Sequence, residues 1–153
     1  MLSIIIPARN EEDNLEDILQ YFQEGLRDVD FEVILVNDFS DDNTLEKSQK
    51  IFDSNKNFKI VDNRVKGLGG AINLGIKESQ GKKISIMMAD LSDDINDLIK
   101  YNKIMDEKNL DAVLGSRFLK GSQVRDYPFK KLILNRIFNF FVGLIFMNKY
   151  NDY

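Results

Sequence analysis

Short apolar runs alternate along the chain with segments in which apolar residues recur at helical spacing. The first run covers residues 2–6, and the apolar residues from Leu15 to Phe22 then fall on one face of a helix. The same cycle predicts further strands over 31–36, 58–61, 83–88 and 112–114, and further helices over 42–52, 68–78 and 94–107. Regular alternation of strand and helix predicts an α/β fold with a mostly parallel sheet and helices on both faces.

Charged side chains follow several of the predicted strands at the point where each strand ends. In open parallel sheets, ligands bind beyond the carboxyl ends of the strands. The segments at these ends are residues 7–11, 36–41, 88–93 and 115–118. The first three carry carboxylates and the last carries Arg117, a set that suits a metal-bridged diphosphate.

The segment 132–147 is mostly apolar, and its few polar residues lie on one stripe of a helix. Lys130, Lys131 and Lys149 flank it, as basic residues flank a helix that lies in a membrane surface. Because the run is short and interrupted, we expect an interfacial helix and not a membrane span. A core helix covered by further chain is the alternative, since periodicity alone does not separate the two.

The amino-acid composition limits the classes of reaction and ligand that the chain can support. The 153 residues fit one domain, and a formal charge of -4 disfavours binding to nucleic acid. The chain has no Cys and no His, which excludes thiol nucleophiles, imidazole bases and the usual zinc sites. Carboxylates would then hold a hard cation such as Mg²⁺ or Mn²⁺. No basic segment precedes the first apolar run, so we expect the cytoplasm or the cytoplasmic face of a membrane.

Several of these strand-end segments resemble those of family 2 glycosyltransferases. The resemblance lies in SIIIPARNEE (3–12), LVNDFSDDNT (35–44), KGLGGAIN (66–73) and IMMADLSDD (86–94). GSRFLKG (115–121) is similar to the polyprenyl-phosphate branch, which includes dolichyl-phosphate mannosyltransferases. The resemblance implies a GT-A-like fold that binds a nucleotide-sugar donor.

The resemblance also implies which residues bind the donor, with Asp38 placed at the nucleotide base. The donor-binding residues that it implies are Pro7, Arg9, Glu11, Val36, Asp38, Lys66, Gly67 and Asp90. Purely structural roles are open as well: Asp41 or Asp42 would cap a helix, and the glycines of 66–70 would permit close helix packing.

An Asp-x-Asp segment holds a divalent cation against the donor diphosphate in the family that the chain resembles. Here Met88 stands at the first position, and its thioether is a poor ligand for a hard cation. We therefore expect Mg²⁺ or Mn²⁺ to depend on Asp90, with Asp93 nearby and with diphosphate and water as the other ligands.

The acceptor side is implied in the same way. Arg117, Lys130, Lys131 and Arg136 are the candidates for contact with a lipid phosphate, although a surface role is the ordinary one for such residues. Asp152 matches an acceptor-side aspartate, which makes it a candidate general base beside the candidate catalytic residues Asp90 and Arg117. Members of the family continue beyond this point, so we expect the chain to be truncated at its C-terminus.

These patterns predict a catalytic domain over residues 1–131, followed by the interfacial helix and the start of the acceptor motif over 132–153. The predicted activity is inverting transfer of a sugar from a donor such as GDP-mannose or UDP-glucose to a polyprenyl or dolichyl phosphate, at the membrane surface. Two alternatives remain: transfer to a saccharide hydroxyl, and a noncatalytic module that binds nucleotide sugars.

Overall fold

The computed structural model describes residues 1–116, 119 and 128–147. Met1–Asp111 form one compact unit and Ala112–Tyr153 belong to a second. The first unit contains, in chain order, β1 (Leu2–Ala8), α1 (Leu15–Gly25), β2 (Phe31–Asn37), α2 (Thr44–Phe52), β3 (Phe58–Asp62), α3 (Leu68–Glu78), β4 (Lys83–Ile86) and α4 (Ile95–Lys108). The predicted alternation of strand and helix is confirmed throughout this unit.

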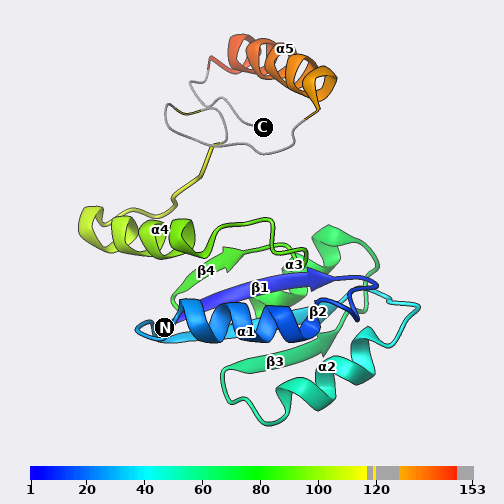
Figure 1. Ribbon diagram of the computed structural model, residues 1–153. Helices are drawn as coiled ribbons and strands as arrows, with labels where there is room; N and C mark the ends of the chain where they lie inside the picture. The colour runs from blue at the N-terminus through cyan, green and yellow to red at the C-terminus, as the bar shows by residue number, and fades with distance from the viewer. Residues whose placement is uncertain (117–118, 120–127, 148–153) are drawn as a thin grey trace. The chain divides into compact units, whose positions relative to one another are not determined.

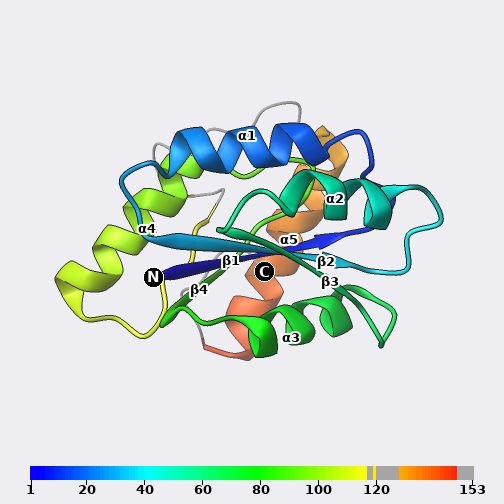
Figure 2. The same cartoon turned by 90° about the horizontal axis from the view of Figure 1, so that it is seen from below.

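The four strands form one parallel sheet in the order β3-β2-β1-β4. Helices α1 and α2 cover one face of the sheet and α3 covers the other (Figure 2). The predicted α/β class, with a parallel sheet between helices, is confirmed. The chain moves outward from β1 to β3 and then returns to place β4 on the other side of β1, so the strand order reverses between β1 and β4.

The larger apolar core lies between the sheet and the helices α1, α2 and α4. Leu2, Ile4 and Ile6 alternate along β1 and are buried there, as the period of two in a strand requires. Ile18 and Phe22 of α1 are completely buried in the same core. The central strand is therefore fixed by packing along its whole length.

A smaller core lies on the α3 face, where Ile5, Ile34 and Val36 pack with Ala71. Gly75 lets α3 come close to the sheet, because a Cβ at this position would lie 2.3 Å from Cγ2 of Ile5. This close approach fixes α3, whose first turn contains Gly69 and Gly70 of the glycine-rich segment.

Two features near the end of the chain complete the fold. The predicted strand over 112–114 is wrong, because these described residues form no strand and Leu114 is 70% exposed. So short an apolar run gives few ladder hydrogen bonds, and nothing in its period separates a strand from extended chain. The second unit contains α5 (Phe129–Ile145), which confirms the predicted helix, with Pro128 at its start (Figure 1).

Within the described residues, no helix combines the length and the apolar character that crossing a membrane requires.

Candidate functional site

The carboxyl ends of the parallel strands meet at one edge of the sheet, which we call the carboxyl edge (Figure 1). Ala8 pairs with Asn37 and Asn37 pairs with Asp62, so the loops after β1, β2 and β3 start side by side. The backbone N–H of Asp38 extends the pairing by donating to the carbonyl of Ala8 at 2.8 Å. Because the strand order reverses between β1 and β4, this edge has the topology of a ligand crevice.

Asp38 is held rigidly at this edge. Its side chain is only 7% exposed, and Oδ1 accepts from Nδ2 of Asn63 at 2.7 Å and from the backbone N–H of Gly67 at 2.9 Å. The Gly67 N–H also lies 3.1 Å from Oδ2. A carboxylate accepts about four hydrogen bonds, so Oδ2 keeps the capacity to accept a bond from a ligand.

Asn63 connects this carboxylate to the loop between β3 and α3. The Asn63 side chain is 5% exposed, and its Nδ2 also donates to the Val65 carbonyl at 2.6 Å. Its Oδ1 accepts from the Val65 N–H at 3.2 Å. Asn63 therefore fixes both Asp38 and the loop that carries Lys66 and Gly67.

Gly67 ends this loop as the N-cap of α3, and Gly69 and Gly70 lie in the first turn of that helix. Gly67 has a φ of 112°, which side-chain-bearing residues rarely adopt. A Cβ on Gly70 would lie 1.9 Å from the carbonyl oxygen of Val65, whereas a Cβ on Gly69 would meet nothing within 4 Å. The contact with Val65 gives Gly70 the close-packing role that the sequence left open. The positive φ explains why a glycine stands at position 67.

The loops after β1 and β2 are joined by hydrogen bonds between backbone and side chain. The N–H of Glu11 donates to Oγ1 of Thr44 at 2.9 Å, and the N–H of Asn10 donates to Oγ of Ser40 at 3.1 Å. In return, the N–H of Asp41 donates to Oδ1 of Asn10 at 2.8 Å. The two loops consequently form one preorganised surface.

Asp42 lies just before the start of α2, whose N-cap is Asn43, so the N-cap role that the sequence left open for Asp41 or Asp42 is wrong. The Asp42 side chain accepts from the hydroxyl of Thr44 at 2.5 Å and from the Thr44 N–H at 3.0 Å. Burial raises the pKa of the Asp42 carboxyl, but the bonds from Thr44 and from the Glu12 N–H outweigh it and leave the pKa below its usual 3.8. This carboxylate belongs to the scaffold of the site.

The loop after β4 presents the candidate metal ligands. Asp90 is exposed and accepts from the N–H of Ser92 at 3.0 Å, while Asp93 accepts from the N–H of Met88 at 2.9 Å. In the described part of the chain, no three acidic side chains gather to hold a metal ion. An exposed carboxylate such as that of Asp90 suits a hard cation that takes its other oxygens from a phosphate ligand and water. Met88 of this loop is 42% exposed, and its thioether is a poor ligand for a hard cation.

The other predicted donor-binding residues of the first unit differ in burial. Pro7 and Val36 are buried neighbours in the sheet, so a ligand would reach them through backbone atoms at the strand ends. Arg9 and Lys66 are exposed at the carboxyl edge, and the Arg9 guanidinium lies 3.9 Å from Asp41. Glu11 accepts from the Asn14 side chain at 2.6 Å, which ties it to the turn before α1.

The predicted acceptor residues belong to the second unit. Lys130, Lys131 and Arg136 lie on α5. Arg117 and Asp152 lie outside the described residues. The acceptor roles of all five therefore stay predictions.

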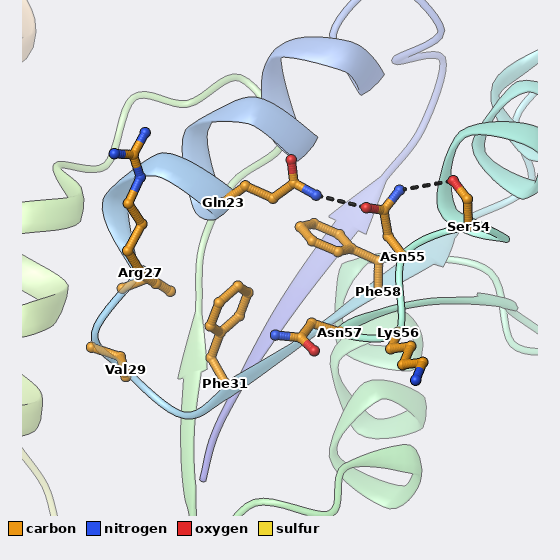
Figure 3. Close-up of a pocket in the computed structure, with 10 residues that line it drawn as sticks. Gln23, Arg27, Val29, Phe31, Ser54, Asn55, Lys56, Asn57 and Phe58 are labelled. Atoms are coloured by element: carbon orange, nitrogen blue, oxygen red, sulfur yellow. Dashed lines mark hydrogen bonds between the residues drawn. The ribbon is translucent and has the colours of Figure 1, made fainter.

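A hollow of about 370 Å³ lies at the amino ends of β2 and β3, away from the carboxyl edge. Figure 3 shows Gln23 of α1 reaching Asn55, with a hydrogen bond of 2.6 Å between the two side chains. None of the ten lining residues is acidic, and Phe31 and Phe58 begin the two strands there. Its position separates this hollow from the predicted donor site.

Asn63 and Thr44 are the site residues that sequence reasoning missed. Asn63 directly follows β3, so the rule that ligands bind at strand ends would have found it had that strand end been included. Thr44 lies in the segment 35–44 that resembles the family. No signal in the sequence shows that its hydroxyl accepts a hydrogen bond from the loop after β1.

Comparisons of sequence and structure find known proteins that are similar to this chain. The chain is 31% identical over 135 residues to the dolichol-phosphate mannosyltransferase of Pyrococcus furiosus, covering 88% of this chain and 38% of that protein. The crystal structure of S. aureus TarS 1-349 matches with a TM-score of 0.63 and 26% identity, over 83% of this chain and 38% of that one. A mannosyltransferase from Pyrobaculum calidifontis in complex with GDP-Man and Mn²⁺ matches in fold, with a TM-score of 0.59 and 22% identity over 68% of this chain and 32% of that one.

The chain thus spans well under half the length of each of these relatives. The structural matches confirm the predicted GT-A-like fold. The model of glycosyl transferase family 2 matches residues 3–151, nearly the whole sequence. The chain therefore belongs to glycosyl transferase family 2.

Proposed function

We propose that the carboxyl edge binds a nucleoside-diphosphate sugar and that the chain is the donor-binding part of an inverting glycosyltransferase. The observation that carries this proposal is the placement of two aspartates around the reversal of strand order. Asp38 follows β2 and Asp90 follows β4, on opposite sides of the loop after β1. Two intervals between neighbouring strands, roughly 10 Å in all, separate β2 from β4 at this edge.

This separation suits a ligand with two different ends. Asp38 has a free acceptor position for an N–H of the nucleobase, and Asp90 lies exposed for the diphosphate end. Arg9 lies on the loop between them, where its guanidinium would bind a phosphate oxygen. The complexes of related structures with UDP and with GDP-Man and Mn²⁺ support a nucleotide ligand.

Asp90 would hold the divalent cation, with the donor diphosphate supplying further oxygens. When bound, Mg²⁺ or Mn²⁺ offsets the negative charge that develops on the leaving diphosphate. Arg9 would add positive charge to the same group, and Arg117, outside the described residues, stays a candidate from the sequence for this role.

The reaction that fits is a single displacement. An acceptor oxygen forms the new bond to the anomeric carbon as the bond from that carbon to the diphosphate breaks, and the nucleoside diphosphate leaves with the electron pair. One displacement inverts the anomeric centre. With a polyprenyl phosphate as acceptor, the attacking oxygen is already ionised, so a strong general base such as Asp152 is not essential.

The name of the Pyrococcus relative supports a polyprenyl phosphate acceptor, as do the basic residues Lys130, Lys131 and Arg136 on the apolar helix α5. The proposed location is the cytoplasmic face of a membrane, with α5 in contact with its surface. A second candidate function is noncatalytic binding of nucleotide sugars, which Met88 favours because it removes one hard ligand from the metal site.

A transfer assay separates these functions. The chain is incubated with radiolabelled GDP-mannose or UDP-glucose, Mn²⁺ and a short polyprenyl phosphate, and label is measured in the lipid extract. We expect labelled lipid from the unaltered chain and at least a tenfold lower rate from Asp90→Asn, since the cation loses its protein ligand. If label appears only in a saccharide offered as acceptor, the acceptor is a saccharide hydroxyl and not a lipid phosphate. Donor binding without any transfer would support the noncatalytic function.

A further inference from the structure

Phe39 has an unusual conformation at the carboxyl edge. Its φ is 56°, in the left-handed region that a bulky side chain rarely adopts. The residue follows Asp38 directly, so the strained position lies next to the carboxylate proposed to bind the nucleobase. Backbone strain of this kind persists where the surrounding structure enforces it, and it clusters at binding sites.

Packing does not explain this strain. The Phe39 side chain is 42% exposed, and neither apolar core of the described chain includes it. This places a partly exposed aromatic ring at the residue that follows a buried carboxylate. It is a suitable arrangement for a planar ligand, because a ring face stacks on any nucleobase.

Lys66 supplies a second contact. Its Nζ lies 5.9 Å from the centroid of the Phe39 ring, and the next residue, Gly67, donates its N–H to Asp38. Phe39 and Lys66 are thus tied to the same carboxylate from two different loops. Among the described residues, Lys66 forms no ion pair, so its ammonium is available to a phosphate.

We propose that Phe39 is a stacking platform for the nucleobase of the donor, with Asp38 accepting from the base and Lys66 contacting the adjoining phosphate. This inference rests on the proposed function and adds a binding residue to it. Stacking recognises the base by its flat face, so Phe39 contributes affinity for nucleotides in general, and selection between bases falls to the hydrogen bond with Asp38.

The test is calorimetric titration of the full chain, in buffer with Mn²⁺, with UDP, with GDP and with inorganic diphosphate. Phe39→Gly removes the ring and relieves the strain, whereas Phe39→Leu removes the ring and keeps the Cβ. We expect both variants to bind the tighter of UDP and GDP about tenfold more weakly and to bind inorganic diphosphate as before. Phe39→Trp, which keeps a stacking face, should bind the nucleotide within about twofold of the unaltered chain.

Asn109→Gly is the matched control. Asn109 also has a left-handed φ, of 49°, and it lies at the end of α4. This substitution relieves the same kind of strain elsewhere, and it should leave nucleotide binding unchanged.

Three results would overturn the inference. If Phe39→Gly and Phe39→Leu bind the nucleotide as tightly as the unaltered chain, the ring does not stack, and the proposed function stands without it. If the two variants also bind inorganic diphosphate about tenfold more weakly, Phe39 affects binding through the conformation of its loop and not by stacking. If the unaltered chain binds neither nucleotide, the proposed function fails together with the inference.

Discussion

Asn63 is the residue on which the predicted base site most depends. Its buried amide donates to Asp38 at 2.7 Å and to the Val65 carbonyl at 2.6 Å, and replacing it removes one of the two donors to Asp38 and this donor to Val65. We expect Asn63→Ala to lower the free energy of unfolding by about 2 kcal/mol, because buried polar groups then lose their hydrogen bonds. Urea unfolding followed by circular dichroism measures the change.

Asn57→Ala is the control for Asn63, since Asn57 is an exposed asparagine in the turn before β3. Its effect should stay within about 0.5 kcal/mol. Equal stability of the two variants would contradict the role given to Asn63.

We expect the free energy of unfolding to depend on pH through the carboxyl group of Asp42. The Asp42 pKa is lower in the folded chain than its usual 3.8, so the folded state gains stability above that pH and loses it as pH falls through the lowered pKa. Asp42→Asn should therefore be less stable than the unaltered chain at pH 7, with the difference shrinking below about pH 4. Urea unfolding at pH 7, 5 and 3 measures it.

Asp28→Asn, at an exposed position after α1, is the matched control and should show little difference from the unaltered chain at any of these values. A difference for Asp42→Asn that grows as the pH falls would contradict the assigned hydrogen bonds.

The junction between β3 and α3 tests the structural role of the glycine-rich segment. Gly70→Ala places a Cβ 1.9 Å from the Val65 carbonyl and should lower the free energy of unfolding by about 2 kcal/mol through overpacking. Gly69→Ala meets nothing within 4 Å and should raise it by about 0.5 kcal/mol, because alanine favours a helix over glycine. Thermal unfolding of the pair measures both, and effects of the same sign would contradict this packing.

At the scale of elements, the strands and helices of the first unit were predictable because their apolar periods are long and clear. The boundaries of these elements were less predictable. Helix α2 begins at Thr44, two residues after the predicted start, because the Asp42 side chain accepts the Thr44 N–H in the turn before the helix. The strand predicted over 112–114 failed because so short a run carries no period.

The candidate site was predictable from the sequence only in part. The sequence places Asp38 and Asp90 at strand ends, and the parallel order of the sheet brings those ends to one edge. It does not reveal that Gly67 and Asn63 hold Asp38, since those bonds join residues 25 and 29 positions apart. Nor does it reveal the left-handed conformation of Phe39, which depends on the folded loop.

For the molecule as a whole, the proposed membrane contact depends on α5. Phe140 and Leu144 of this helix are 67% and 65% exposed. We expect the chain to sediment with vesicles that contain anionic lipid, and expect Phe140→Glu to weaken this binding at least tenfold, because a buried phenylalanine contributes about 2 kcal/mol.

Leu110→Glu, at an exposed apolar residue just after α4, should sediment as the unaltered chain does. Failure of the unaltered chain to bind any vesicle would contradict the interfacial role of α5 and would leave the donor site unaffected.

The central claim is that a nucleotide sugar binds at the carboxyl edge between Asp38 and Asp90. Calorimetric titration with GDP-mannose and UDP-glucose in the presence of Mn²⁺ tests it most directly, with Asp38→Asn, Asp90→Asn and the exposed control Asp97→Asn. We predict that the unaltered chain binds one of the donors and that both site variants weaken binding at least tenfold, while Asp97→Asn does not. Undiminished binding by Asp38→Asn and Asp90→Asn, or no binding of either donor by the folded chain, would contradict the claim.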